Sequence, residues 1–364
     1  MNINITVIGS TGKLGVKLLK YAFKNNIKIS AICCYKNSKK LNEQKKLYFI
    51  KNSFILSDDV ENKGFFTYLK KKIHIIYFLD FGSSSLLYLR QFIKYNSNSL
   101  IAIANKELII AGGKVMMKEI HQSNNTFIPL DSEHFSLKNT NFNKKNINKI
   151  FITASGGPFF FTKKKNFSDV KMNEVLSHPK WKMGKNNLID SSNFINKILE
   201  IFELSHIYDI PVNKIDFLIS KEAFIHSIVI LKDGSVSFNA FKNDMLLTLM
   251  YPLSIYFDLS YKVNYEKYFE NLDNFSTTTK KDSRFIFFKY YEVMKKFSHI
   301  DQINLMLLNN HAQSLYLSGK INYTDIIPYS MNKIIKNKNK KLIFKSTLDI
   351  INHIKKFKES IKFV

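Results

Sequence analysis

The strongest constraint on the fold is an alternation of short apolar runs and helical patterns over the first 130 residues. The apolar runs have strand length and are Ile3–Ile8, Ile29–Cys34, Ile73–Leu79, Leu100–Ala104 and Thr126–Leu130. Helical periodicity separates several of them, in Leu14–Phe23, Phe65–Lys71, Ser84–Tyr95 and Lys106–His121. Strands that alternate with helices form parallel sheets covered on both faces. We therefore expect a doubly wound α/β domain over residues 1–130.

The rest of the chain predicts two further domains. A strand at Lys149–Thr153 runs into a glycine-proline turn, and an irregular basic stretch follows it. Asp190–Tyr208 has the apolar stripe of one amphipathic helix, and a hairpin is expected around Lys232-Asp233-Gly234. The remaining strand candidates are Ile215–Ile219, Ser227–Leu231 and Ser235–Ala240. We expect a central α+β catalytic domain at 131–270 with a flexible loop at about 156–187, and a C-terminal helical domain at 280–364.

The net charge of +26 is carried almost wholly by lysine, because only Arg90 and Arg284 among the 55 basic residues are arginine. Lysine, asparagine, isoleucine and phenylalanine all have AT-rich codons, so this bias is typical of a protein from an AT-rich, reduced genome. Proteins that read bases favour arginine, so a nucleic-acid role is not expected. Two alternatives stay open, a lysine-rich surface without function and a field that attracts phosphorylated ligands.

The sequence also predicts where the protein resides. It lacks a run of about 18 uncharged apolar residues, so we expect no membrane span. It starts directly with a strand pattern, which argues against a leader peptide. The cysteines are the neighbours Cys33 and Cys34, which a strand would point to opposite faces. A structural disulfide is therefore not expected, and we predict a cytoplasmic protein.

A glycine-rich turn follows the first apolar run. Gly9–Gly15 has the spacing G-x-x-G-x-x-G and opens the first helix. Glycines at this point let backbone N–H groups approach a pyrophosphate, as in Rossmann-like domains. After the second strand stand Tyr35–Lys40, which contain cations and no acid, so NADP(H) is favoured over NAD. A plain turn without a ligand is the alternative.

Acidic residues suggest a metal site. Asp131 and Glu133 come directly after a strand, where open α/β sheets present ligands, although a helix cap explains them equally well. Asn196, Lys197 and Glu200 share one face of the predicted Asp190–Tyr208 helix, together with Asn193. Oxygen ligands from Asp131, Glu133 and Glu200 would favour Mg²⁺ or Mn²⁺ over zinc. A polar face in contact with solvent is the alternative for the helix.

Two further residues are ambiguous by type alone. Lys106, which begins a helix at the end of a strand, could polarise a carbonyl group or simply belong to a capped helix start. His178 lies in the basic loop, where a lone histidine is more often a surface or packing residue than a catalytic one. Their neighbours in the sequence have to decide both cases.

Taken together, these segments resemble the 1-deoxy-D-xylulose-5-phosphate reductoisomerase family of the methylerythritol phosphate route to isoprenoids. The matching motifs occur in family order between about residues 9 and 236, and the stretch from His178 to Glu200 is the most specific. The matching stretches are Gly9–Gly15, Ala104–Glu107, Pro129–His134, Thr153–Phe159, His178–Gly184, Asp190–Glu200, Ile225–Ser227 and Asp233–Val236.

The resemblance implies an NADPH-dependent enzyme that isomerises 1-deoxy-D-xylulose 5-phosphate and reduces the resulting aldehyde to 2-C-methyl-D-erythritol 4-phosphate. It implies a homodimer and a divalent metal, Mg²⁺ or Mn²⁺, held by Asp131, Glu133 and Glu200. The implied substrate residues are Lys106, Ser132 and Glu133 for the sugar, Ser155, Ser191, Asn196 and Lys197 for the phosphate, and His178 and Trp181 for loop closure. The implied cofactor contacts are Thr11, Gly12, Lys13, Leu14, Tyr35, Lys36, Asn37, Asn105, Glu107 and Gly184.

The chain departs from the family pattern at the cofactor end. Lys13 stands where the family usually has serine, and Tyr35 where it usually has glycine. Two rival functions remain at this point: an NADP-dependent dehydrogenase of another phosphorylated sugar, and a binding protein that has kept the fold without activity. Turnover of 1-deoxy-D-xylulose 5-phosphate, dependent on both metal and NADPH, distinguishes all three.

Overall fold

The computed structural model describes residues 3–140, 143–162, 167–177, 184–261, 266, 270, 275–279, 281–336 and 342–361. The chain forms two compact units. The first comprises Met1–Phe135 and Lys242–Asn264, and the second comprises Ser136–Phe241 and Tyr265–Val364. The division into three domains stays a prediction. No helix in these described ranges is long and apolar enough to cross a membrane.

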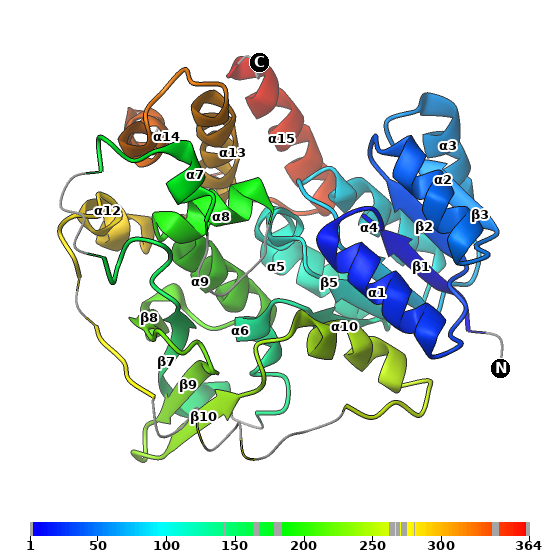
Figure 1. Cartoon of the computed structure of the whole chain (residues 1–364), viewed down its shortest axis with the longest axis horizontal. Coiled ribbons are helices and arrows are strands. Elements are labelled where there is room, and N and C mark those ends of the chain that lie inside the picture. Colours follow the sequence, from blue (N-terminus) through cyan, green and yellow to red (C-terminus); the bar gives the residue numbers. More distant parts are fainter. Residues whose placement is uncertain are drawn as a thin grey trace. The chain divides into compact units, whose positions relative to one another are not determined.

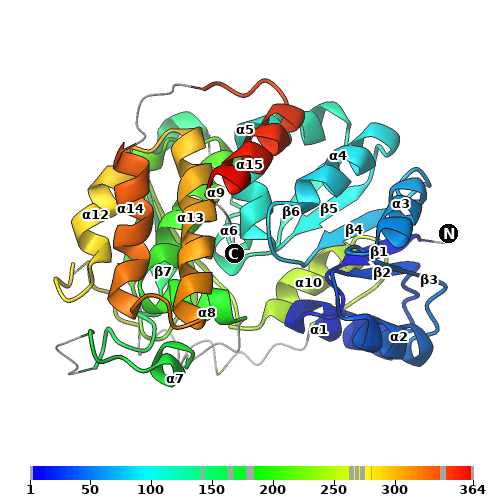
Figure 2. The same ribbon diagram turned by 90° about the horizontal axis from the view of Figure 1, so that it is seen from above.

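The first unit contains the blue and cyan segment of Figure 1. It is built on a six-stranded parallel sheet with the strand order β3-β2-β1-β4-β5-β6, whose strands Figure 2 labels. Its strands are β1 (Ile5–Ile8), β2 (Ala31–Cys34), β3 (Asn52–Ile55), β4 (Ile75–Phe78), β5 (Leu100–Ile103) and β6 (Thr126–Pro129). Four of them, β1, β2, β4 and β5, are buried along their whole length. Strands buried on both faces read as continuous apolar runs, which is why the sequence reveals them. The expected doubly wound α/β fold is confirmed.

Helices cover both faces of this sheet (Figure 2). They are α1 (Lys13–Lys24), α2 (Ser38–Leu47), α3 (Asp59–Tyr68), α4 (Ser85–Tyr95), α5 (Lys106–Gln122), the short α6 (Ser132–Phe135) and α10 (Met245–Ser254). One apolar cluster joins Leu18 of α1, Leu41 of α2 and Leu253 of α10 to the strands. On the other face, α3 and α4 meet through Phe65 and Tyr88, whose ring centroids are 5.3 Å apart.

The second unit contains a four-stranded sheet with the order β10-β9-β7-β8. Its strands are β7 (Ile147–Ala154), β8 (Ile215–Ile219), β9 (Ile225–Leu231) and β10 (Val236–Ala240). The expected hairpin is present, because β9 and β10 pair antiparallel across a turn in which Gly234 has a φ of +88°. The helices are α7 (Met172–Val175), α8 (Lys185–Ser192), α9 (Ile195–Tyr208), α12 (Phe287–Met294), α13 (His299–Leu317), α14 (Ile326–Lys336) and α15 (Thr347–Ser360).

The prediction of one continuous helix over Asp190–Tyr208 is wrong. The chain breaks between α8 and α9 at Phe194, which adopts a left-handed backbone conformation with a φ of +69°. The Phe194 side chain is buried against several rings, and the nearest, Phe285, lies 4.8 Å away between centroids. The Asn193 side chain accepts a hydrogen bond from the Ile195 N–H at 3.0 Å, so Asn193 supports the start of α9 and does not share its polar face. Burial of an aromatic ring therefore outweighs the strain of the turn.

The packing of β1 against β4 gives a test with a matched control. A Cβ atom on Gly9 would lie 2.4 Å from the backbone nitrogen of Asp80, whereas one on Gly82 would meet nothing within 4 Å. Both glycines have a positive φ, +83° and +96°. Gly82→Ala should lower the free energy of unfolding by about 1–2 kcal/mol through backbone strain alone. Gly9→Ala should lower it clearly more, because the ends of β1 and β4 must separate. Urea unfolding measures both, and equal losses would contradict the close packing.

Candidate active site

The glycine turn of the first unit is held by backbone hydrogen bonds. The N–H groups of Gly9 and Ser10 both donate to the carbonyl oxygen of Cys33, at 2.9 and 3.0 Å. Helix α1 begins after Gly12, which provides no side-chain cap, and its first turn contains no acidic residue. The first N–H groups of a helix without such a cap favour an anion, and the helix dipole adds to that preference. The turn therefore has the chemistry that a dinucleotide pyrophosphate requires.

The sequence pattern does not predict helix α2 or strand β3, and α2 supports this turn. The buried Gln44 side chain donates to the Ser10 carbonyl oxygen at 2.8 Å and accepts from the Ser10 hydroxyl group at 2.9 Å. The Lys40 ammonium group donates to the carbonyl oxygen of Thr11 at 2.8 Å. The signal in the sequence was weak, because Leu41 and Leu47 are the apolar residues of an otherwise polar, lysine-rich stretch.

The residues predicted to recognise the adenosine end lie directly after β2. Tyr35 is 65% exposed, and the Lys36 ammonium group lies 5.4 Å from the centroid of its ring. The Asn37 side chain accepts a hydrogen bond from the Lys40 N–H and so begins α2. Exposed cations at this strand end suit the 2′-phosphate of NADP(H) better than a bare ribose.

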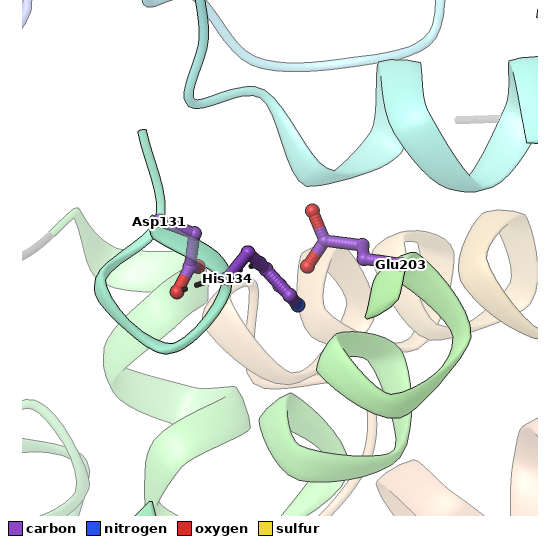
Figure 3. A group of neighbouring side chains, drawn as sticks. All are labelled: Asp131, His134 and Glu203. Carbon is purple, nitrogen blue, oxygen red and sulfur yellow. Dashed lines mark ion pairs between the residues drawn. The ribbon is translucent and has the colours of Figure 1, made fainter. Parts of the chain in front are cut away.

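The carboxylates expected to bind a metal follow β6. The Asp131 carboxylate forms an ion pair with Lys106, and carboxylate oxygens of Asp131 and Glu133 lie within 4.8 Å of one another. The Ser132 hydroxyl group donates to Glu133 at 2.5 Å. The imidazole Nδ1 of His134 lies 3.8 Å from an Asp131 oxygen, and a dashed line marks this pair in Figure 3. Two hard oxygen donors so close together fit a magnesium or manganese ion.

A helix cap is the alternative role for acidic and polar residues at these strand ends. The structure gives this role to Asn105 and hardly to Asp131. The Asp131 side chain accepts from the Glu133 N–H at 3.4 Å, at the start of a helix of only four residues, so capping contributes little. The Asn105 side chain accepts from the Leu108 N–H at 3.0 Å and caps the 17-residue α5. Asn105 thus has a structural role in addition to the predicted cofactor contact, and it places Lys106 at the first position of the helix. Glu107, the next residue of α5, is buried.

In the second unit the structure brings four predicted phosphate residues around one pocket. Its lining includes Ser155, Ser191, Asn196 and Lys197. Gly156 and Gly157, which follow Ser155 in the chain, also line the pocket. Gly157 has a φ of +59°, and a Cβ atom there would lie 2.6 Å from the carbonyl oxygen of Ser191. The glycine therefore allows the end of β7 to approach α8. A pocket lined by two hydroxyl groups, an amide and an ammonium group offers the donors that a phosphate group accepts.

Glu200 is held on α9 by its own neighbours. The Lys197 ammonium group donates to a Glu200 oxygen at 2.5 Å and to the carbonyl oxygen of Thr153 at 2.8 Å. The Asn196 amide group donates to the other oxygen of Glu200. Lys197 and Glu200 are both buried. One turn later α9 carries another buried carboxylate, Glu203, which Figure 3 also draws. The sequence did not predict a role for it, despite its helical spacing from Glu200.

Helix α13 holds the residue that precedes Ser191 of the pocket. Asn309 and Gln313 of α13 donate to the buried carboxylate of Asp190 at 2.8 and 2.5 Å, and Asp190 directly precedes Ser191. Gly184 lies at the N-terminal boundary of α8. His178 and Trp181, predicted to close over the substrate, lie outside the described residues.

Comparison with known proteins identifies the family. The relative from Campylobacter lari, 1-deoxy-D-xylulose 5-phosphate reductoisomerase, is 32% identical over 88% of this chain and 89% of its own length. The relative of the same name from Clostridium botulinum is 32% identical and covers 92% and 93%. The chain belongs to the 1-deoxy-D-xylulose 5-phosphate reductoisomerase family. Residues 127–208 also match the model of the 1-deoxy-D-xylulose 5-phosphate reductoisomerase C-terminal domain.

Solved structures support the fold of this family. The Zymomonas mobilis reductoisomerase in complex with NADPH aligns with a TM-score of 0.81 at 22% identity, over 99% of this chain and 98% of that one. A reductoisomerase in complex with NADPH, fosmidomycin and magnesium aligns with a TM-score of 0.82 at 20% identity, over 99% and 97%. The α/β architecture predicted from the sequence is therefore confirmed.

The buried ion pair of α9 predicts a large stability effect. Lys197→Met removes the ammonium group that faces buried Glu200. The Glu200 carboxylate then stays buried without this partner, which should lower the free energy of unfolding by about 3–5 kcal/mol. The matched control is Lys281→Met. The Lys281 side chain, paired with Glu292, is 53% exposed, so its loss should change the free energy of unfolding by less than about 0.5 kcal/mol. Urea denaturation measures both, and a loss of similar size in the two variants would show that the α9 pair contributes no more than a surface pair.

Proposed function

We propose that the chain converts 1-deoxy-D-xylulose 5-phosphate into 2-C-methyl-D-erythritol 4-phosphate, with NADPH and a divalent metal ion, in the synthesis of isoprenoid precursors. Membership of the reductoisomerase family carries the proposal. The glycine turn of the first unit and the donor-lined pocket of the second unit support it, because they suit a dinucleotide and a phosphorylated sugar.

The phosphate group of the substrate is assigned to the pocket of the second unit. Ser155 and Ser191 contribute hydroxyl groups, and Asn196 contributes an amide group. Lys197 supplies the positive charge that offsets the phosphate, while its carbonyl contact with Thr153 fixes the ammonium group in place. Binding energy from this remote group orients the sugar for reaction. His178 and Trp181 are proposed to exclude water from the bound substrate.

The reacting part of the sugar is assigned to Lys106, Ser132 and Glu133. Lys106 begins α5 with its ammonium group beside Asp131, so it can donate to a substrate oxygen as negative charge develops there. The Ser132–Glu133 hydrogen bond orients the Glu133 carboxylate. These residues bind and orient the sugar, and they exchange protons with its hydroxyl groups during isomerisation.

Asp131, Glu133 and Glu200 are proposed as the metal ligands. The observation that supports this set is its chemistry, because all three supply carboxylate oxygens and two of them already lie within 4.8 Å of each other. Magnesium or manganese, when bound, polarises the substrate oxygens, and NADPH, when bound, supplies the hydride. The NADPH contacts are proposed at Thr11, Gly12, Lys13, Leu14, Tyr35, Lys36, Asn37, Asn105, Glu107 and Gly184.

The metal assignment predicts a variant that binds cofactor without turnover. Glu200→Gln keeps the shape of the side chain and removes its charge, so NADPH oxidation with 1-deoxy-D-xylulose 5-phosphate should fall by at least about 10³-fold. NADPH affinity should stay within about twofold, because the glycine turn belongs to the other unit. Glu292→Gln, at a glutamate 61% exposed, is the control and should keep full activity. Near-normal turnover of Glu200→Gln would remove Glu200 from the ligand set.

A homodimer is the proposed assembly, and β10 is its proposed interface. β10 is an edge strand of the second sheet and exposes Phe238 to 59% and Val236 to 46%. An exposed apolar edge strand is a surface that a second copy can cover.

A cytoplasmic location in a bacterium with an AT-rich genome is also proposed, supported by the two free, buried cysteines and the lysine bias.

The proposed interface is tested by sedimentation. Phe238→Glu should shift the protein towards monomer, because the new charge would be buried between the copies. Phe49→Glu is the matched control, since Phe49 is an apolar residue of the first unit that is 83% exposed. A dimer that survives Phe238→Glu unchanged would place the interface elsewhere.

A further inference from the structure

Asp80 is an acid at the cofactor end of the first sheet to which the proposed mechanism gives no role. It follows β4 by two positions, in an otherwise apolar run. The Ser85 hydroxyl group donates to one oxygen of its carboxyl group. The Asn105 amide group donates to the other oxygen at 3.2 Å, and it also donates to the Gly82 carbonyl oxygen at 3.0 Å. Asp80 thus connects the start of α4 to the N-terminal cap of α5.

The same residue lies against the glycine turn. The Asp80 backbone is so close to Gly9 that a Cβ atom on the glycine would lie 2.4 Å from the Asp80 nitrogen. Gly9 opens the turn where an anionic dinucleotide is expected to bind. In a parallel sheet the ends of β1 and β4 form the crevice for such a ligand, because the direction of the helix connections changes there.

The surroundings of Asp80 raise the affinity of its carboxyl group for a proton. Burial raises the pKa of Asp80 to about 6, and the hydrogen bonds from Ser85 and Asn105 offset only part of that rise. Its titratable neighbours are the Cys33 thiol of β2 and the Tyr88 hydroxyl of α4, and burial raises the pKa of each, that of Tyr88 to about 12. Among the described groups no cation lowers the pKa of Asp80. Lys106, next to Asn105, pairs with Asp131 instead.

We infer that Asp80 is a positioning residue that couples cofactor binding to a proton: NADP(H) binds beside the neutral carboxyl group and is repelled once that group has ionised. The inference rests on the proposed NADPH-dependent function. Two like charges that share a site of low polarity disfavour one another, so the anionic cofactor and the Asp80 carboxylate compete. By linkage, cofactor binding must then raise the proton affinity of Asp80.

The sign of the pH effect follows from this competition. At low pH Asp80 is neutral, and replacing it with asparagine should leave the affinity for NADP⁺ unchanged. As the pH rises through the pKa of Asp80, the wild-type protein acquires a charge that Asp80→Asn lacks. At about pH 8 the variant should bind NADP⁺ about tenfold more tightly than the wild type, which corresponds to a pKa change of about one unit on binding. The 2′-phosphate of the cofactor also titrates, but it affects both proteins equally.

Calorimetric titration with NADP⁺ from about pH 5 to about pH 8 is the experiment. In buffers of different ionisation enthalpy, the wild type should take up a fraction of a proton on binding near neutral pH, and Asp80→Asn should take up less. Asp59→Asn, at an exposed acid of α3, removes the same charge and should behave as the wild type. A ratio of wild-type to Asp80→Asn affinity that does not change with pH would overturn the inference.

A second variant covers the case in which Asp80→Asn does not fold. Ser85→Ala keeps the carboxyl group and removes a hydrogen bond that lowers its pKa, so the midpoint of the pH effect on affinity should move to higher pH. A midpoint that stays in place would contradict the assignment to Asp80. Failure of the wild type to bind NADP⁺ at any pH would instead reject the proposed function, so the two failures are distinguishable.

Discussion

The contact between Gly9 and the backbone of Asp80 is the constraint on which the first unit depends. No side chain fits between the ends of β1 and β4 at this point, so the glycine turn is fixed against the strand that follows it in the sheet. From there the hydrogen bonds of Asp80 reach α4 and the cap of α5. The cofactor turn and the helix that carries Lys106 are therefore parts of one packed structure. A substitution in the cofactor turn should therefore shift the helix that carries Lys106, and a substitution in that helix should shift the turn.

A strained residue plays the equivalent part in the second unit. Phe194 accepts a left-handed backbone conformation because its ring is buried in an aromatic cluster. The resulting break directs α8 and α9 separately, so that Ser191 at the end of one and Asn196 at the start of the other line the same pocket. A continuous helix would carry residues five positions apart on widely different faces. The strain is thus located where ligand binding is proposed.

The sequence predicted the elements whose pattern depends on burial alone. Strands such as β1 and β4 are buried on both faces and read as apolar runs, and the turn at Gly9 has a spacing that few other structures need. The sequence did not predict helix α2 because this helix buries only Leu41 and Gln44. It did not predict β3 because this strand is only half-buried. The break at Phe194 could not be foreseen, since nothing in the local sequence favours a left-handed phenylalanine and the stabilising rings come from residues as distant as Phe285. Glu203 shows a further limit, because buried acids on an amphipathic helix look like any polar position.

The position of α10 in the first unit has a consequence for how the protein is made. This helix is separated from β6 by more than a hundred residues, yet Leu249 and Leu253 belong to the core of the first sheet, and Tyr77 donates to the Leu249 carbonyl oxygen at 2.9 Å. A nascent chain that ends near residue 135 would leave one face of that sheet partly uncovered. At ribosomal speeds of about 5–20 residues per second, roughly 6–24 s pass before α10 has been synthesised. During that time the strands of the second unit are synthesised, before the first unit is complete. Each unit consists of two separate chain segments. A single cut in the chain therefore cannot release either unit whole.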